Sequence, residues 1–297
     1  MPCRTPSWNG SLCSRLRRLA LGLATLLLLA VYSGGCLVVP DSSRLDALAR
    51  RATLITNGFT LHYHLATTNP AAWNLVFIHG TPASGGIWHS QFVRPFPDAN
   101  LLAYDRPGFG DSKPTRRRPH LADQVAALTN LLAVLPSLPT ILVGHSYGGP
   151  VALQAALDRP DVVAGVVLIG GSVDPAQERP LWVQYPFNYT GTSFWLPGWL
   201  RQCNRELLTL KGDLLELEAA VPGLQVPVVM LHGGRDQQVP VANVAFLRAQ
   251  LAAVGRTNLF RELVFPDYTH FIPWEHPDAV EQALQELVRL IKAGTRR

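Results

Sequence analysis

The chain has 297 residues, of which 47% are hydrophobic and 16% are charged, a composition that predicts a sizeable buried core and excludes extended disorder. The formal net charge is +5, but four of the 26 basic side chains and none of the 21 acidic ones lie in residues 1–35, which leaves +1 for the remainder. The basic excess therefore belongs to the N-terminus, and we expect no nucleic acid among the partners.

Residues 1–35 have the pattern of an export signal. Arginines precede an apolar run over 19–31, and small residues lead from this run to Cys36. Two interpretations remain open. The small residues before Cys36 resemble the signal of a bacterial lipoprotein, in which this cysteine carries the lipid. Alternatively, the stretch from Leu19 to about Pro40 is an uncleaved anchor, close to the roughly 20 residues that span a bilayer. Both predict a domain outside the cytoplasm that is attached to a membrane.

Residues 36–52 are expected to form a tether, after which strand-like apolar runs alternate with helical patterns. The expected strands are 53–56, 59–65, 75–78, 101–104, 140–143, 162–169, 226–231 and 259–265. The expected helices are 121–135, 150–157 and 278–292. Asn57-Gly58 predicts a two-residue hairpin between the first two strands. This alternation predicts an α/β fold, with a mostly parallel central sheet of about eight strands flanked by helices, built from residues 53–172 and 224–297.

Residues 173–223 interrupt this alternation. The segment is rich in aromatic side chains and prolines and has no strand pattern. A loop of this length inside a compact domain is unusual unless it has a structure or function of its own. We interpret it as an inserted helical lid over a cleft, with a loosely packed surface excursion as the alternative. Its candidate substrate contacts are Trp182, Tyr185, Phe187 and Trp195.

The sharpest chemical signal is Gly144-His145-Ser146-Tyr147-Gly148, which follows an expected strand and precedes an expected helix. In that context the pattern Gly-x-Ser-x-Gly forms a tight turn that presents a nucleophilic serine. Gly144 and Gly148 leave room for the turn. The backbone N–H groups at the start of the helix favour negative charge nearby. We therefore predict Ser146 as a nucleophile.

A serine hydroxyl needs a base to activate it, and the base needs an acid to orient it. Asp236 and His270 follow the serine in the order that such a turn requires, and each comes just after an expected strand. Ligand sites of open α/β sheets lie at these carboxyl ends of strands. We predict His270 as the base and Asp236 as the acid. The rival candidates are Asp213 and Asp267 for the acid and His276 for the base.

The sequence His79-Gly80-Thr81-Pro82 also follows an expected strand. In this type of fold, a backbone N–H from such a loop and the N–H of the residue after the nucleophile form an oxyanion hole. The predicted donors are the N–H groups of Thr81 and Tyr147.

Together with the segment from Asp105 to Ser112 and the stretch Gly234-x-Asp236, these motifs resemble the α/β-hydrolase fold superfamily. The resemblance covers residues 53–292 and points to the lid-bearing class that includes epoxide hydrolases, haloalkane dehalogenases, small esterases and carbon–carbon bond hydrolases. It implies a structural role for Asp105. The epoxide and haloalkane members attack with an aspartate, whereas this chain has Ser146, which favours acyl transfer to water.

The residues and the resemblance predict a serine hydrolase that cleaves a small to medium apolar carboxylic ester, or a related acyl bond, through an acyl-enzyme. We expect no cofactor and no metal, and the expected partners are a small-molecule substrate and, through the N-terminus, a membrane. Carbon–carbon or amide hydrolysis by the same residues, acyl transfer to another acceptor, and a membrane-tethered binding protein without catalysis remain as alternatives.

Overall fold

The computed structural model describes residues 41–294 with the exception of 57, 115–117, 181 and 189–195. The expected export signal and the lipidation candidate Cys36 lie outside the described residues. Among the helices of the described ranges, none combines the length and the apolar character needed to cross a bilayer.

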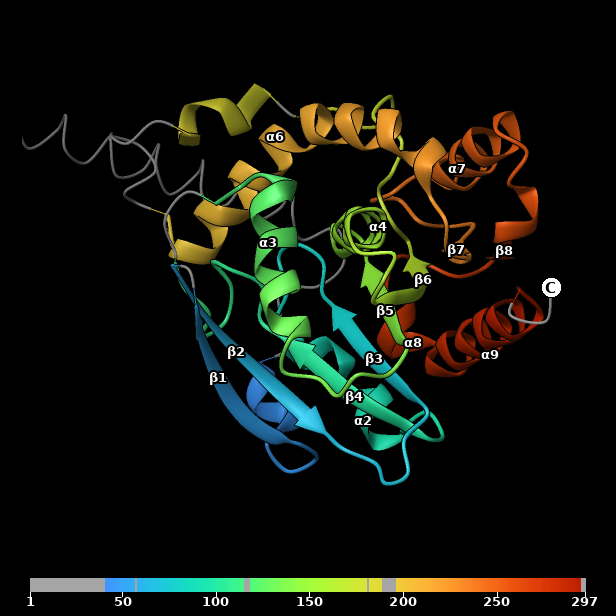
Figure 1. Ribbon diagram of the computed structural model, residues 1–297. Helices are drawn as coiled ribbons and strands as arrows, with labels where there is room; N and C mark the ends of the chain where they lie inside the picture. The colour runs from blue at the N-terminus through green and yellow to red at the C-terminus, as the bar shows by residue number, and fades with distance from the viewer. Residues whose placement is uncertain (1–40, 57, 115–117, 181, 189–195, 295–297) are drawn as a thin grey trace, which may run out of the picture. The chain divides into compact units, whose positions relative to one another are not determined.

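Eight strands of the described chain form one sheet in the order β1-β2-β4-β3-β5-β6-β7-β8 (Figure 1). They are β1 (Arg50–Thr56), β2 (Phe59–Ala66), β3 (Trp73–Ile78), β4 (Ala99–Tyr104), β5 (Thr140–His145), β6 (Val163–Ile169), β7 (Val228–Gly233) and β8 (Phe260–Phe265). The pairs β1–β2 and β2–β4 are antiparallel, and all the other pairs are parallel. The expected sheet and the expected first hairpin are thus confirmed.

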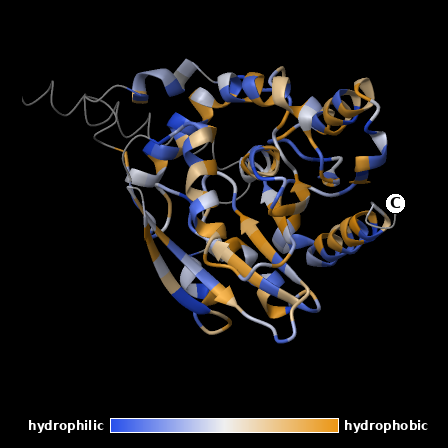
Figure 2. Cartoon of the chain, in the orientation of Figure 1, coloured by the Kyte–Doolittle hydropathy of each residue, from blue (hydrophilic) through white to orange (hydrophobic). Residues whose placement is uncertain are grey.

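Helices cover both faces of the sheet. Successive side chains of a strand point to opposite faces, so Val76 and Ile78 belong to one core cluster, whereas Leu75 and Phe77 belong to the other. The first cluster includes side chains from α3 (Leu121–Leu132), α4 (Gly148–Asp158) and α7 (Ala242–Ala253). The second includes side chains from η2 (Gly85–Trp88), α2 (His89–Val93), α8 (Ile272–Glu275) and α9 (Pro277–Gly294). Figure 2 shows the predominantly hydrophobic strands between these layers.

Residues 41–52, expected to belong to a tether, are part of the fold. The 3-10 helix η1 (Ser42–Leu45) buries Leu45 completely in the second core cluster. Ser42 Oγ donates a hydrogen bond of 3.1 Å to Asp105 Oδ2. β1 begins at Arg50 rather than at Thr53 and pairs with β2 along its whole length. The sequence does not indicate that the strand begins at Arg50, because β1 is a half-exposed edge strand whose first two residues are arginines.

The inserted segment contains a long helix that packs onto the core. This helix, α6 (Gly198–Ala220), has 23 residues and is followed by the 3-10 turn η4 (Val221–Gly223). Leu210, Leu214 and Leu217 of α6 are buried in the first core cluster. The helical character of the insertion was expected, but its described residues do not show a separate lid. A second short turn outside the insertion, η5 (Thr257–Leu259), precedes β8.

The described aromatic side chains of the 3-10 helix η3 (Trp182–Asn188) differ in burial. In this helix, residues three apart lie on the same face because a 3-10 helix has three residues per turn. Gln184 and Phe187 form its buried face, whereas Trp182 and Tyr185 are 82% and 54% exposed. Trp182 and Tyr185 thus face solvent in this structure, and their contact with substrate stays a prediction. Trp195 lies outside the described residues.

Candidate active site

Ser146 lies in a strained turn between β5 and α4. Its φ of 55° is in the left-handed region, which costs a residue with a side chain roughly 1–3 kcal/mol. A Cβ on Gly144 would lie 2.2 Å from the carbonyl oxygen of Gly148, and a Cβ on Gly148 would lie 2.3 Å from that of Ile78. Both neighbours are backbone atoms that cannot move aside alone. The two glycines therefore allow the close packing that holds Ser146 in this conformation.

His270 and Asp236 meet beyond the carboxyl ends of β8 and β7. Nδ1 of His270 lies 2.7 Å from Oδ2 of Asp236, and both side chains are almost completely buried. The other oxygen of Asp236, Oδ1, accepts the backbone N–H groups of Gln238 at 2.9 Å and Val239 at 2.8 Å. Because a carboxylate can only accept, the imidazole carries its hydrogen on Nδ1. Nε2 of His270 is then the atom that can take a proton.

The Asp236 carboxyl is held in its charged form. Burial raises its pKa, but the hydrogen bond and the charge of His270, together with the two backbone N–H groups, outweigh burial. The pKa of Asp236 therefore lies below its ordinary value of 3.8. A carboxylate that remains charged at neutral pH can orient the imidazole and stabilise it once it is protonated.

The backbone brings Ser146 to the same edge of the sheet. The N–H of Ser146 donates a hydrogen bond of 2.9 Å to the carbonyl of Ile169 at the end of β6. The next residue, Gly170, packs so closely on the acid–base pair that an added Cβ would lie 3.2 Å from both Asp236 Oδ2 and His270 Nδ1. No hydrogen bond joins Ser146 Oγ to another described residue, and catalytic hydrogen bonds often tighten only when substrate binds.

The rival residues lie elsewhere. The Asp267 side chain is 77% exposed and forms a surface ion pair. Asp213 lies on α6 and accepts the backbone N–H of Leu121 at 3.1 Å. The ring of His276 stacks on that of Tyr268, with centroids 3.5 Å apart. The pair of His270 and Asp236 therefore has no competitor among these three residues.

The loop after β3 lies against the serine turn. A Cβ on Gly80 would be 2.7 Å from Cβ of Ser146, so the loop backbone reaches the predicted nucleophile. The backbone N–H groups of Thr81 and Tyr147 have no acceptor among the residues that the structure describes. Two such donors beside a nucleophile are what an oxyanion hole requires.

His145 lies in the serine turn, and its side chain binds the backbone of His270. Its Nε2 donates a hydrogen bond of 2.9 Å to the backbone carbonyl of His270, and the ring centroids of the two residues are 4.7 Å apart. Burial, with a smaller contribution from the charge of His270, lowers the pKa of His145 to about 3. His145 is therefore a neutral donor at neutral pH. The contact joins positions far apart in the sequence, so no local pattern indicates it.

We expect acid to destabilise the protein below pH 6.5. The pKa values of His79, His145 and His232 all lie below the ordinary value of 6.5, chiefly because burial disfavours their charged forms. In the unfolded chain each of these side chains binds a proton more readily, which favours unfolding in acid. The free energy of unfolding is therefore undiminished above pH 6.5, and it falls as the pH drops from 6.5 through the pKa of each folded histidine. Each contributes a loss of up to about 1.4 kcal/mol per pH unit. Urea unfolding at pH 7, 6 and 5 measures this slope.

The matched variant is His145→Gln, which keeps an N–H donor but cannot take up a proton. The free energy of unfolding of this variant should fall less steeply as the pH is lowered. The difference in slope should be up to about 1.4 kcal/mol per pH unit, the contribution of one proton. Identical pH slopes for the parent and the variant would contradict a depressed pKa of His145 in the folded state.

The sheet order and the strained serine turn define a fold of the α/β-hydrolase type, and comparison with known proteins agrees. A model described as "Alpha/beta hydrolase family" matches residues 75–283. That match runs from β3 into α9 and includes Ser146, Asp236 and His270. The chain therefore belongs to the alpha/beta hydrolase family.

Two proteins of similar sequence and one of similar structure show what this chain resembles. Pimeloyl-[acyl-carrier protein] methyl ester esterase of Xanthomonas oryzae pv. oryzae is 29% identical over 269 residues, which covers 77% of this chain and 98% of the esterase. Lipase LipV of Mycobacterium tuberculosis is 39% identical over 99 residues, which covers 33% of this chain and 36% of the lipase. The structure of haloalkane dehalogenase DbeA from Bradyrhizobium elkani has a TM-score of 0.65 at 17% identity and covers 82% of this chain and 99% of that chain.

Proposed function

We propose that this protein is a serine hydrolase that cleaves a carboxylic ester with a small to medium apolar group through an acyl-enzyme. The strained turn at Ser146, beside the buried pair of His270 and Asp236, is the observation that carries the proposal. Two similar proteins, the methyl ester esterase and the lipase, are ester hydrolases by name, which supports an ester as the substrate class.

In the first step, Ser146 Oγ attacks the ester carbonyl carbon while Nε2 of His270 takes the hydroxyl proton. Asp236 stabilises the resulting imidazolium. The N–H groups of Thr81 and Tyr147 bind the oxyanion of the tetrahedral intermediate. The ester C–O bond then breaks, and His270 passes its proton to the leaving alcohol.

In the second step, water takes the place of the alcohol. It loses a proton to Nε2 of His270 and attacks the carbonyl carbon of the acyl-enzyme. A second tetrahedral intermediate forms in the same oxyanion hole. Its collapse releases the carboxylic acid, and His270 returns the proton to Ser146 Oγ.

A fluorophosphonate probe and a series of 4-nitrophenyl esters of increasing acyl length test this proposal. We expect the probe to label Ser146, as identified by mass spectrometry, and kcat/KM to be highest for short to medium acyl chains. A folded protein that neither reacts with the probe nor hydrolyses any ester would contradict the proposal and favour a binding protein. Ester formation with an added alcohol, without release of acid, would instead indicate an acyltransferase.

We also propose that the N-terminal segment attaches this activity to a membrane. The support is the apolar run over 19–31 and the small residues before Cys36. Mass spectrometry of the mature protein, expressed with its own N-terminus, distinguishes lipid on Cys36 from an intact anchor. A mature chain with neither, recovered without detergent, would contradict the attachment.

A further inference from the structure

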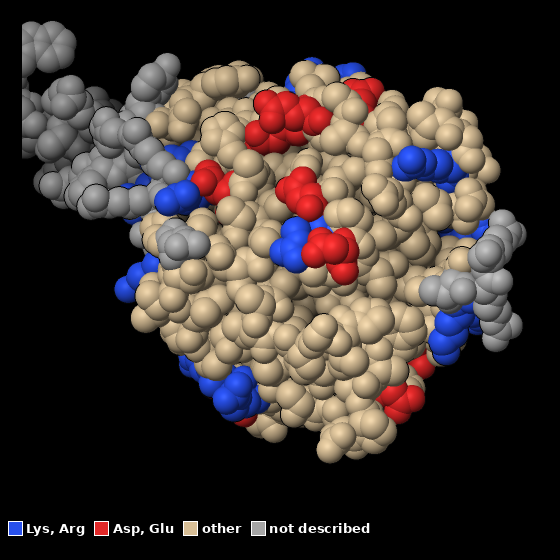
Figure 3. All heavy atoms as spheres, viewed as in Figure 1, with Lys and Arg blue, Asp and Glu red and all other residues tan. Residues whose placement is uncertain are grey.

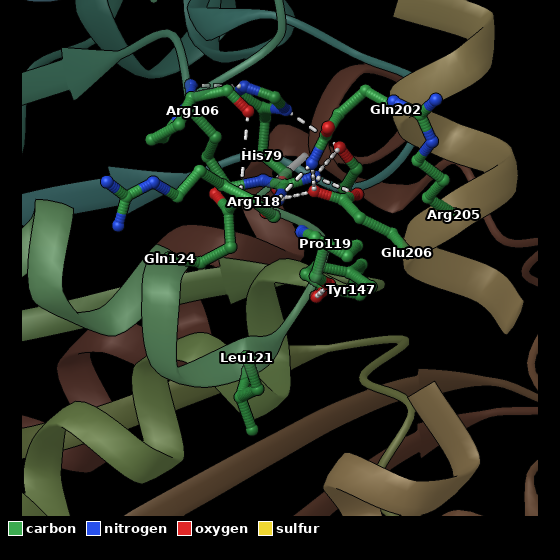
Figure 4. Close-up of polar contacts among 12 residues, drawn as sticks. His79, Arg106, Arg118, Pro119, Leu121, Gln124, Tyr147, Gln202, Arg205 and Glu206 are labelled. Carbon is green, nitrogen blue, oxygen red and sulfur yellow. Dashed lines mark hydrogen bonds and ion pairs between the residues drawn. The ribbon is translucent and has the colours of Figure 1, made fainter. Parts of the chain in front are cut away.

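A buried ion pair joins the inserted helix to the core of the domain. Charged side chains lie at the surface over the face shown in Figure 3, where exposed ion pairs contribute little to stability. Arg106 and Glu206, in contrast, both have fully buried side chains. Nη1 and Nη2 of Arg106 donate to the two carboxylate oxygens of Glu206 at 2.8 and 3.1 Å (Figure 4). Apolar side chains in place of such a pair often give equal or greater stability, so stability alone explains it poorly.

The remaining donors of Arg106 bind the loop that touches Ser146. Nε donates to the carbonyl of His79 at 2.9 Å, and Nη2 donates to the carbonyl of Gly80 at 3.0 Å. The backbone N–H of Arg106 donates to Nε2 of His79 at 2.9 Å. The His79 ring therefore carries its hydrogen on Nδ1, which donates to the same carbonyl of Gly80 at 2.7 Å. Two donors thus hold the Gly80 carbonyl.

The orientation of this carbonyl decides where the next N–H points. The carbonyl of Gly80 and the N–H of Thr81 belong to one planar peptide unit, in which they point in opposite directions. Holding the carbonyl therefore holds one of the two proposed oxyanion donors. Hydrogen bonds to a carbonyl also polarise the peptide and strengthen its N–H as a donor. The other donor belongs to Tyr147, whose ring lies 4.6 Å from the guanidinium carbon of Arg106.

We propose that Arg106 and Glu206 are positioning residues of the oxyanion hole, and that α6 takes part in the site by supplying Glu206. This inference rests on the proposed ester hydrolysis at Ser146. Glu206 neutralises Arg106 and lets the guanidinium stay buried against the loop. Gln202, one turn earlier on α6, donates to Glu206 Oε1 at 3.2 Å and to the carbonyl of Arg118 at 3.0 Å. These hydrogen bonds join α6 to Arg118 and, through Glu206, to Arg106.

The double variant Arg106→Leu/Glu206→Leu tests this proposal, because it removes both charges together and leaves neither one buried without its partner. We expect the variant to fold with a lower melting temperature than the parent, because the buried carbonyl of His79 loses the hydrogen bond from Arg106. For a 4-nitrophenyl ester, kcat should fall about 100-fold with KM nearly unchanged, since a misplaced oxyanion donor acts on the transition state. A trifluoromethyl ketone, whose adduct with Ser146 carries the same oxyanion, should bind more weakly by a similar factor.

The matched control is Asp213→Asn on the same helix. Asp213 also ties α6 to the core, through the N–H of Leu121 and the ring of His120, but it does not contact the loop. The control should keep the parental kcat. Parental kcat in the double variant would overturn the proposal, as would an equal loss of kcat in Asp213→Asn, because that loss would mean that any loosening of α6 suffices.

Hydrogen exchange over residues 79–84 provides a readout that does not depend on activity. It should become faster in the double variant and stay unchanged in Asp213→Asn, and unchanged exchange in the double variant would overturn the proposal. If the double variant does not fold, Glu206→Gln, which keeps the side-chain shape, should show the same pattern with a smaller loss of kcat. If the parent protein neither hydrolyses esters nor reacts with a fluorophosphonate, the proposed function is wrong. Hydrogen exchange would still decide whether Arg106 and Glu206 hold the loop.

Discussion

Replacement of Ser146 by alanine is expected to lower kcat for ester hydrolysis about 10⁶-fold, the scale seen when a serine nucleophile is removed. The melting temperature should stay close to that of the parent. The turn is held by Gly144, Gly148 and the hydrogen bond from the Ser146 N–H to Ile169, and the hydroxyl contributes to none of these contacts. Alanine at a φ of 55° is also no more strained than serine. Steady-state kinetics and thermal unfolding measure the two effects.

The matched control is Ser90→Ala in α2, which lies against the second core cluster and should hydrolyse the ester at the parental rate. Parental kcat in purified Ser146→Ala would remove Ser146 from the mechanism. Loss of activity together with loss of the folded state would show that the hydroxyl stabilises the turn. We do not expect this result, because the hydroxyl forms no hydrogen bond with another described residue.

The second large effect is expected for Asp236→Asn, with a loss of about 10⁴-fold in kcat. The backbone N–H groups of Gln238 and Val239 both require an acceptor, so the amide oxygen should face them. The amide NH₂ then points at Nδ1 of His270, which must accept rather than donate. The imidazole hydrogen moves to Nε2, and the ring can no longer take the proton of Ser146. The kcat of the purified variant measures this effect.

Asp267→Asn is the control for this variant, because Asp267 is only three residues before His270 but has a side chain that is 77% exposed. It should leave kcat unchanged. An equal loss of activity in both variants would indicate a general effect of charge near His270. A loss of activity in Asp267→Asn alone would show that the acid is Asp267 and not Asp236.

Two features of the structure were hidden in the composition of the sequence. Residues 41–52 were expected to belong to a tether and the insertion was expected to form a lid, because composition shows how apolar a segment is but not which face of it is buried. In η1 the single side chain of Leu45 reaches the core, and in η3 a repeat of three residues leaves Trp182 and Tyr185 in solvent. Short elements contain too few residues for a periodic pattern to reveal these faces.

The amino-acid sequence by itself determined the sheet, the serine turn and the positions of Asp236 and His270 after strand ends, because apolar runs, glycines and chain order are local signals. Only the tertiary structure decided which distant groups meet. Arg106 and Glu206 are 100 residues apart, and His145 and His270 are 125 apart, yet each pair is in hydrogen-bond contact. A buried arginine or histidine leaves no periodic pattern in the chain, since its partner depends on how the layers pack and not on spacing.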